Sequence, residues 1–406
     1  MAYQNVGTPR FYIDLPSYIK SLGLNIQEQQ LFENYDIYGN PIVPNPNGQY
    51  TYLDAPYFGL DNVDINKNTT ESIIIDNNGN ERNEPIKTQF TLLDETQESR
   101  LTDFINPKKF YLGLINFKWN TDMAGEHYSP FGLSISKTSY NFGDPTPTYP
   151  NMIYSWDGNE EILTEQEYIS NIVNVNNVDN KFDIEKNGVS ILTGNIDGLD
   201  EWNQYKFMGL SFNVDFSSLG GISFGSYYDM PVSPDLDLSM TVEFDGYDST
   251  NTLGGSTLTN VRYSGSPWWY DAGGNKVEPW SVGASSGFSK RNGRRMWSMK
   301  FSYMSDKDIF ASNYMSNTYL ETSTDYESDD LTTDNNNFEY TLENDNSFIA
   351  QVLNKVGNGQ RFIFQPDNTN NNPDQFAICQ LDQDSLQIKQ VAYKVYDISL
   401  KIREVW

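Results

Sequence analysis

The chain has 406 residues, of which 37% are hydrophobic and 14% aromatic, so it can bury a sizeable core without disulfides. Its formal charge of -28 argues against binding to a nucleic-acid backbone, because such binding relies on clustered Lys and Arg. A single cysteine, Cys379, excludes an internal disulfide framework and a cysteine-based zinc site. The length predicts two or three domains.

Residues 1–119 are predicted to form an N-terminal α+β segment. The expected strands are Phe11–Asp14, Ser72–Ile75 and Phe110–Trp119, and the expected helices are Pro16–Leu22 and Asp94–Ile105. This segment does not open with the basic and then hydrophobic pattern of a signal peptide, and no stretch of the chain is apolar for long enough to cross a bilayer. We therefore expect neither export nor membrane insertion.

Two acidic stretches are candidate calcium sites. Asp61–Asn66 and Asp157–Glu161 gather oxygen-bearing side chains, which suit calcium. Neither stretch completes the twelve-residue loop with its closing glutamate. Asx-rich turns also form the same hydrogen bonds without metal. We interpret both as turns and expect no metal or other cofactor.

Residues 120–293 are predicted to form a β-rich, sandwich-like middle domain. Strands are expected near Asn151–Tyr154, within Lys206–Phe216 and along Leu236–Phe244, and one helix is expected between Glu165 and Val175. The strand at Leu236–Phe244 has the clearest alternation, with an apolar residue at every even position. Two facing sheets would bury such a stripe.

Catalytic chemistry has little support in the residues. The only histidine, His127, lacks a nucleophilic motif around it, so we interpret it as a surface or hydrogen-bonded side chain. Carboxylates are abundant, but a glycosidase needs two of them at a defined separation in a cleft, which a sequence cannot show. We expect a protein that is not an enzyme.

Two clusters are candidate subunit interfaces. Trp268 and Trp269 lie in a glycine-rich stretch, where exposed rings could stack on a sugar or anchor a neighbour, and buried rings would cap a sandwich. Arg291, Arg294 and Arg295 belong to the one dense basic cluster of an acidic chain. Such a cluster is either a solvated turn or a contact to acidic side chains of a second subunit.

Residues 294–406 are predicted to form a C-terminal strand-helix-sheet domain, packed with residues 1–119. The expected elements are a strand at Trp297–Tyr303, a helix at Asn346–Val356, and strands at Arg361–Gln365, at Gln375–Gln380 and from Leu386 onward. Trp297, Phe301, Leu353 and Val356 are expected to share one core. Changes of apolar parity near Lys389–Gln390 and Tyr396–Asp397 predict a turn or bulge at each place.

Some of these segments resemble proteins of tailed bacteriophages. They are Arg294–Trp297, Phe362–Pro366 and Ile402–Trp406. The whole chain, including its opening Tyr3–Tyr12, is similar to uncharacterised virion proteins predicted in marine tailed phages. The C-terminal block more loosely resembles distal-tail and minor-tail proteins, in which a sheet with one packed helix serves as a ring-forming unit.

This resemblance implies a virion structural subunit of the tail, tail tip or an adaptor ring. Its partners would be copies of itself and other virion proteins, with a host-surface glycan as a further ligand, and it would be assembled in the host cytoplasm. The expected fold is mainly β with a few helices, as β-sandwich or tail-tube-like α+β units in a multi-domain chain. Alternatives are a capsid decoration protein and a carbohydrate-binding receptor module.

Overall fold

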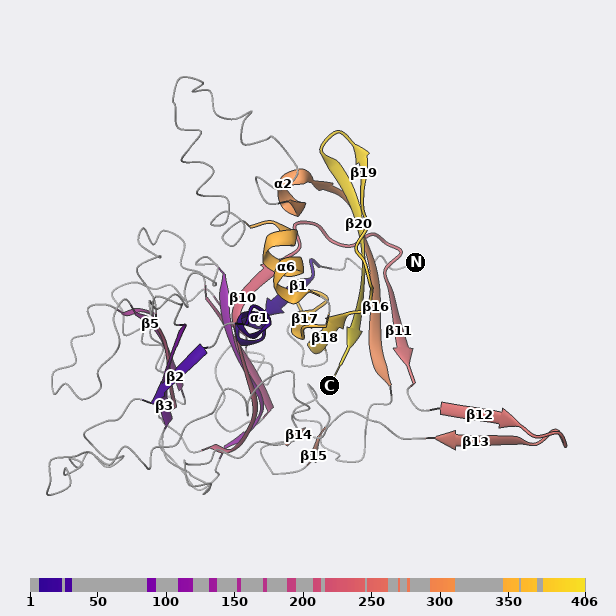
Figure 1. Cartoon of the computed structure of the whole chain (residues 1–406), viewed down its shortest axis with the longest axis horizontal. Helices are drawn as coiled ribbons and strands as arrows, with labels where there is room; N and C mark the ends of the chain where they lie inside the picture. Colours follow the sequence, from indigo (N-terminus) through magenta and orange to yellow (C-terminus); the bar gives the residue numbers. More distant parts are fainter. Residues whose placement is uncertain are drawn as a thin grey trace, which may run out of the picture. The chain divides into compact units, whose positions relative to one another are not determined.

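The fold is known from a computed structural model. It describes residues 7–23, 26–30, 86–92, 109–119, 131–136, 152–154, 171–173, 188–194, 207–212, 216–244, 247–261, 269–270, 276–277, 293–310, 346–357, 359–370 and 375–405. These residues are mainly β with few helices, which confirms the predicted fold class (Figure 1).

The chain divides into two compact units. The first combines Met1–Ile13, Tyr227–Trp269 and Asn275–Trp406, and the second combines Asp14–Ser226 with Tyr270–Gly274. The predicted middle range 120–293 therefore contributes residues to both units. The division into three domains with boundaries at 119 and 293 stays a prediction.

The first unit is built on an antiparallel sheet that collects strands from distant parts of the chain. Its strand order is β11 (Ser239–Glu243), β16 (Arg294–Ser305), β20 (Val395–Glu404), β18 (Ala377–Leu381), β17 (Phe362–Gln365), β1 (Arg10–Ile13) and the last residues of β10 (Phe216–Asp229). β19 (Ile388–Ala392) pairs with β20 as a hairpin. β1 thus lies between two strands that are remote from it in sequence.

One face of this sheet is covered by the predicted C-terminal helix. The helix has a π-helical turn, Ile349–Leu353, followed by the short α-helix α6, Asn354–Val356. It ends at Gly357, whose φ of 52° is readily adopted only by glycine, as the predicted C-cap requires. Trp297, Phe301 and Val356 are buried in one cluster and Leu353 packs against it, which confirms the predicted core.

The predicted strand Trp297–Tyr303 implies that Tyr303 shares the buried face of Trp297, Met299 and Phe301, which is wrong. Buried and outward residues alternate along β16 as far as Phe301, but Tyr303 is 80% exposed and Met304 takes the buried position. A β-bulge shifts the register between Phe301 and Met304, and Tyr303 has a φ of 63°. The extra residue of a bulge moves the side chains after it to the other face.

The predicted turn or bulge at Tyr396–Asp397 is wrong, because β20 runs unbroken from Val395 to Glu404. Phe301 pairs with Ile398 and Met304 with Tyr396, so the extra residue lies in β16 and not in β20. The other predicted irregularity is a register shift between Gln390 and Ala392 in β19. The reversal itself follows at Tyr393–Lys394, where Lys394 has a φ of 57°.

The second unit contains the helix α1 (Leu15–Ser21), which confirms the expected turn of helix after Pro16. Asp14 caps it by accepting from the backbone N–H of Ser17 at 3.0 Å. The buried hydroxyl of Ser223 donates to the other Asp14 oxygen at 2.8 Å, and lies 2.6 Å from the hydroxyl of Tyr111. These bonds satisfy a carboxylate that would otherwise be costly to bury.

Two groups of strands belong to this unit. β4 (Phe110–Trp119) pairs with β10 and with β8 (Gly188–Gly194), and β8 pairs with β7 (Asn171–Val173). A second sheet has the order β2 (Ile26–Gln30), β3 (Ile86–Leu92), β9 (Phe207–Phe212), β5 (Phe131–Ser136) and β6 (Met152–Tyr154). The expected helix at Glu165–Val175 is wrong where it overlaps β7, because pairing with β8 overrides a weak local helical pattern.

The remaining elements are short. α2 (Asp306–Ile309) follows β16. β12 (Tyr247–Asn251) and β13 (Thr257–Val261) form a hairpin, and β14 (Trp269–Tyr270) pairs with β15 (Lys276–Val277). Several predictions lie outside the described residues: those for Asp61–Asn66, Ser72–Ile75, Asp94–Ile105, His127, Asp157–Glu161, Trp268 and Arg291.

Candidate assembly surface

Strand β11 carries an apolar stripe that the described chain leaves uncovered. Met240 pairs with Trp297 of β16, and Val242 pairs with Arg295. Directly opposed residues project from the same face of a sheet. Met240 and Val242 therefore lie on the face that buries Trp297, yet they are 58% and 38% exposed.

The stripe continues on both sides of this pair. Leu236 is 80% exposed and Phe244 65%, whereas Leu238 packs against the core cluster. The expectation that a facing sheet buries the stripe is therefore wrong for the described residues. The helix and strands that form the cluster cover β16 but reach the β11 segment only at Leu238.

β11 also forms an edge of the sheet. It pairs with β16 on one side, and no other described strand pairs with it. Proteins often protect such edges with charged side chains or proline, because an open row of N–H and C=O groups accepts another strand. The only charged residue of β11 is Glu243, which is ion-paired with Arg403 at 2.6 Å. This edge therefore has little protection against strand addition.

The β12–β13 hairpin follows β11 directly and is a second uncovered element. Within the described chain, its two strands pair only with each other (Figure 1). Every side chain from Asp248 to Asn260 is exposed except that of Thr252, and Leu258 is 63% exposed. An isolated two-stranded hairpin is at best marginally stable in water. A partner surface would therefore stabilise it.

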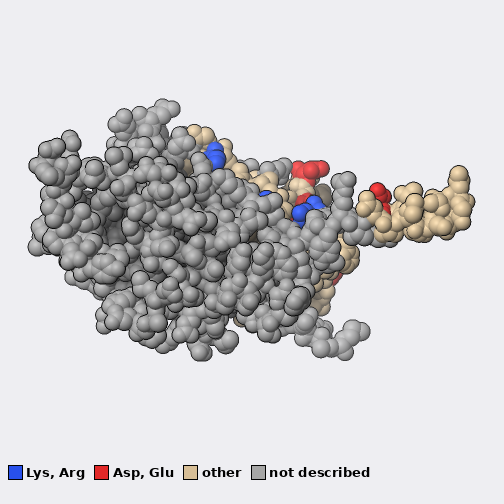
Figure 2. Space-filling view, turned by 90° about the horizontal axis from the view of Figure 1, so that it is seen from below, with Lys and Arg blue, Asp and Glu red and all other residues tan. Residues whose placement is uncertain are grey.

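The tip of the hairpin has a defined turn. The Thr252 hydroxyl donates to the Ser256 carbonyl at 3.0 Å and accepts from the Ser256 N–H at 3.1 Å. Gly255 has a φ of 80°, which favours glycine. The hairpin is almost free of charge: Asp248 is the one charged residue between Tyr247 and Val261. Figure 2 shows this as a tan surface with a single red patch, at the right of the view.

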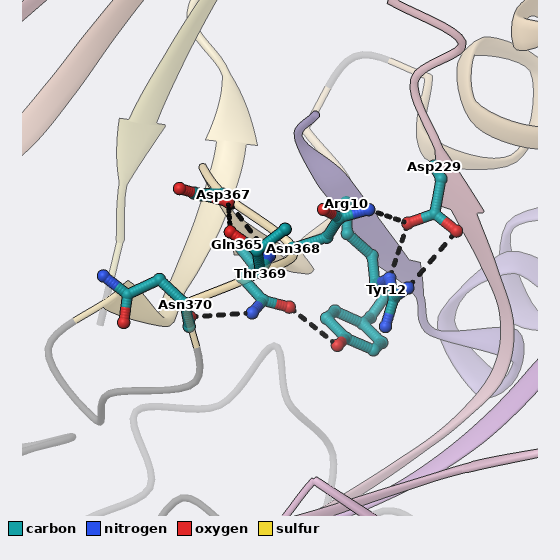
Figure 3. Close-up of polar contacts among 8 residues, drawn as sticks. All are labelled: Arg10, Tyr12, Asp229, Gln365, Asp367, Asn368, Thr369 and Asn370. Carbon is teal, nitrogen blue, oxygen red and sulfur yellow. Dashed lines mark hydrogen bonds and ion pairs between the residues drawn. The ribbon is translucent and has the colours of Figure 1, made fainter. Parts of the chain in front are cut away.

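A polar network holds β1 in the sheet of the first unit (Figure 3). Arg10 donates to both carboxylate oxygens of Asp229, at 2.6 and 3.3 Å, and its guanidinium lies 4.5 Å from the centre of the Tyr227 ring. Asn368 donates to the same carboxylate at 3.1 Å. Burial opposes the charge of Arg10, but Tyr12 and Asp229 outweigh it and raise the pKa of Arg10.

Tyr12 extends this network toward β17. Its hydroxyl donates to the side-chain carbonyl of Gln365 at 2.9 Å, and the Gln365 amide donates to the Asn370 carbonyl at 2.9 Å. Burial raises the pKa of Tyr12 to about 12, so the hydroxyl stays protonated and able to donate. These bonds join groups of the first unit and fix β1 between β10 and β17.

Arg295, a predicted interface residue, has its acidic partner within the chain. Its Nε and Nη2 donate to the two Glu404 oxygens at 3.1 and 2.9 Å, and Nη2 also donates to the Phe376 carbonyl at 2.8 Å. The guanidinium lies 5.0 Å from the Trp297 ring centre, and both members of the pair are buried. The predicted contact to a second subunit's carboxylate is therefore corrected for Arg295.

Of the other predicted interface residues, Arg294 and Trp269 lie in described strands. Arg294 is half-buried at the start of β16, where it pairs with Glu243 in the strand register. Trp269 lies in β14, and Arg291 and Trp268 lie outside the described residues. Their role in an interface stays a prediction.

Sequence reasoning missed the polar partners and the hairpin. Arg10 and Asp229 are 219 residues apart, and no local pattern marks such a pair. The hairpin did have a signal: Gly254 and Gly255 separate two short runs rich in Thr. Glu404 belongs to the phage-like segment Ile402–Trp406, but Asp and Glu are so abundant in the chain that no pattern distinguishes it.

Across the ranges that the structure describes, no group of three or more His, Cys, Asp or Glu side chains could hold a metal ion. None of the helices in those ranges is both long and apolar enough to span a membrane.

Comparison of the chain with protein-family models, with curated proteins and with solved structures found no match. The site must therefore be interpreted from its own geometry. That geometry combines a core with internally bonded polar groups and an edge strand and hairpin whose apolar side chains remain in water.

Proposed function

We propose that this chain is a non-enzymatic structural subunit of a tailed-phage virion, in the tail, the tail tip or an adaptor ring. The observation that carries the proposal is the uncovered core face of β11, where Met240 and Val242 continue the buried face of Trp297 into solvent. An edge strand with unpaired backbone groups and exposed apolar side chains is suited to pairing with a strand of another chain. The resemblance of Arg294–Trp297, Phe362–Pro366 and Ile402–Trp406 to phage proteins supports a phage particle as that assembly.

The polar groups of the first unit also support a structural role. Arg10 donates to Asp229, Tyr12 donates to Gln365, and Arg295 donates to Glu404. Such networks fix strand register and orientation. A rigid sheet that presents an exposed edge fits a part used in many copies, because each contact is then made by the same preorganised surface.

The test is to locate the chain in purified phage particles. Mass spectrometry of particles purified through a density gradient should find it at many copies per particle, and an electron-density map should place its sheet in the tail or its tip. A known major capsid protein of the same particles serves as the internal copy-number standard. Detection only in infected-cell lysate, and not in particles, would refute the proposal.

The map also separates the rival locations. Density on the outer face of the capsid would assign the chain to capsid decoration. A glycan array with the purified chain covers the carbohydrate-binding alternative. Binding that depends on Trp269 would support it, with Leu22→Ala, an exposed apolar change elsewhere, as the matched control.

A further inference from the structure

The β11 edge and the β12–β13 hairpin are complementary to each other. β11 offers an open row of backbone groups beside the exposed apolar side chains Met240 and Val242. The hairpin offers two strands without further pairing among the described residues, with Leu258 exposed on one of them. Addition of a strand to an open edge satisfies both sets of backbone groups at once.

The net charge of the chain limits which surfaces two copies can bring together. Two copies of a chain with a formal charge of -28 repel each other, so a contact between them needs a surface with little charge. The hairpin has only Asp248 among residues 247–261. A second copy of the chain has both the β11 edge and the β12–β13 hairpin. Each copy can therefore add its hairpin to one neighbour and accept the hairpin of another.

We infer that the β12–β13 hairpin of one copy adds to the β11 edge of a second copy, where its side chains lie beside Met240, Val242 and Phe244 on the same face of the extended sheet. The inference deepens the proposed function, on which it rests for its biological role, by naming the partner. The contact is apolar and based on backbone pairing, so it differs from the ionic contact predicted for the basic cluster around Arg291 and Arg294.

Cross-linking between single-cysteine variants tests the contact directly. The native Cys379 is fully buried, so an engineered surface thiol is the reactive one. Val242→Cys and Leu258→Cys proteins are purified separately, mixed and treated with a flexible bismaleimide that tolerates any register between paired strands. A covalent dimer containing one molecule of each variant is the expected product, identified by mass spectrometry of the linked peptides.

Two controls define the outcome. Ser399→Cys, at an exposed position on β20, should give no link to Leu258→Cys. The double variant Val242→Cys/Leu258→Cys, diluted until only intramolecular links form, detects a hairpin that folds back on its own β11. A mixture without the mixed dimer, or a link found only within one chain, would overturn the inference.

The oligomeric state gives an independent measurement. By analytical ultracentrifugation, the wild-type chain should associate, and a variant with residues 248–260 replaced by a short Gly-Ser linker should be monomeric with an unchanged near-ultraviolet spectrum. Association should strengthen when salt rises, because salt screens the repulsion between copies. A wild-type chain that stays monomeric at its solubility limit would overturn the inference, as would a shortened variant that still associates.

Failure here is distinguishable from failure of the proposed function. If the chain forms the mixed dimer but is missing from particles, the contact is supported and the virion role is refuted. If the chain is present in particles but its hairpin does not cross-link to β11, the virion role is supported and this contact is refuted.

Discussion

Two neighbouring strands of the same sheet show the same sequence pattern and opposite burial. β16 and β11 pair along five registered positions, and both alternate apolar and polar residues. Met299 of β16 is 2% exposed, whereas Met240 of β11 is 58% exposed. The difference comes from what covers each strand: the helix residues around Val352 and Val356 join the cluster over β16, and β11 lies at its margin.

This contrast teaches that alternation predicts which residues share a face, but not whether that face is covered. The face of a strand follows from its own backbone geometry. Its cover comes from elements elsewhere in the chain or from another chain. Whether an apolar face is covered therefore depends on the rest of the chain and on its partners. Four measurements test the contrast between covered and uncovered parts of the sheet.

The largest effect is expected on the covered side, at the buried pair Arg295 and Glu404. Arg295→Ala should lower the free energy of unfolding by about 3–5 kcal/mol, because it leaves the Glu404 carboxylate buried without its cation. The measurement is urea unfolding followed by tryptophan fluorescence. The double variant Arg295→Met/Glu404→Leu should recover most of the loss. A cost for Arg295→Ala below about 1 kcal/mol would show that the pair is hydrated.

The two methionines give a matched comparison of the strands. Met299→Ala should cost about 2–5 kcal/mol of unfolding free energy, since it opens a cavity in the core. Met240→Ala, the same chemical change, should stay within about 0.5 kcal/mol in the monomer. Both are measured under conditions where the chain does not associate. Equal costs would mean that β11 is covered within a single chain.

A third effect concerns the stability of the sheet at alkaline pH. Tyr12 loses its proton near pH 10 when unfolded, and burial raises its folded pKa to about 12. Its contribution is therefore complete below about pH 10 and is lost as the pH rises toward 12, by up to about 3 kcal/mol. Tyr12→Phe should abolish this part of the slope. Parallel pH profiles of the two proteins would contradict the assignment.

The smallest effect is expected at an exposed ion pair of β16. Lys300 lies 3.4 Å from Asp397 and 3.6 Å from Asp235, and its side chain is 42% exposed. Lys300→Met should leave the free energy of unfolding unchanged within experimental error, because solvent and salt screen such pairs. Measurement at low and high ionic strength checks this. A loss of unfolding free energy as large as that of Arg295→Ala would mean that this side of the sheet is also shielded from solvent.

The sequence predicts much of the first unit because its signals are local. Alternation identifies β16, helical spacing and Gly357 identify the C-terminal helix, and β1, β17 and β18 follow from short apolar runs. The bulge at Tyr303 was missed, because Tyr303 continues the alternation of apolar residues along β16 although its side chain is exposed.

The candidate site was less predictable. The basic cluster at Arg294 and Arg295 is visible in the sequence, but the acidic partner of Arg295 is Glu404, which lies 109 residues away. Composition cannot pair charges over that separation. The exposed face of β11 was correctly identified as an apolar stripe, and its lack of cover is a tertiary property that no local pattern contains.

The position of β1 has a consequence for how the protein is made. Residues 10–13 pair with residues 362–365, and Tyr12 and Gln365 are 353 positions apart. At roughly 5–20 residues per second of translation, β1 leaves the ribosome about 20 to 70 seconds before β17 exists. The centre of this sheet therefore closes only after most of the chain has been synthesised, and until then β1 can pair with β10 but lacks its β17 partner.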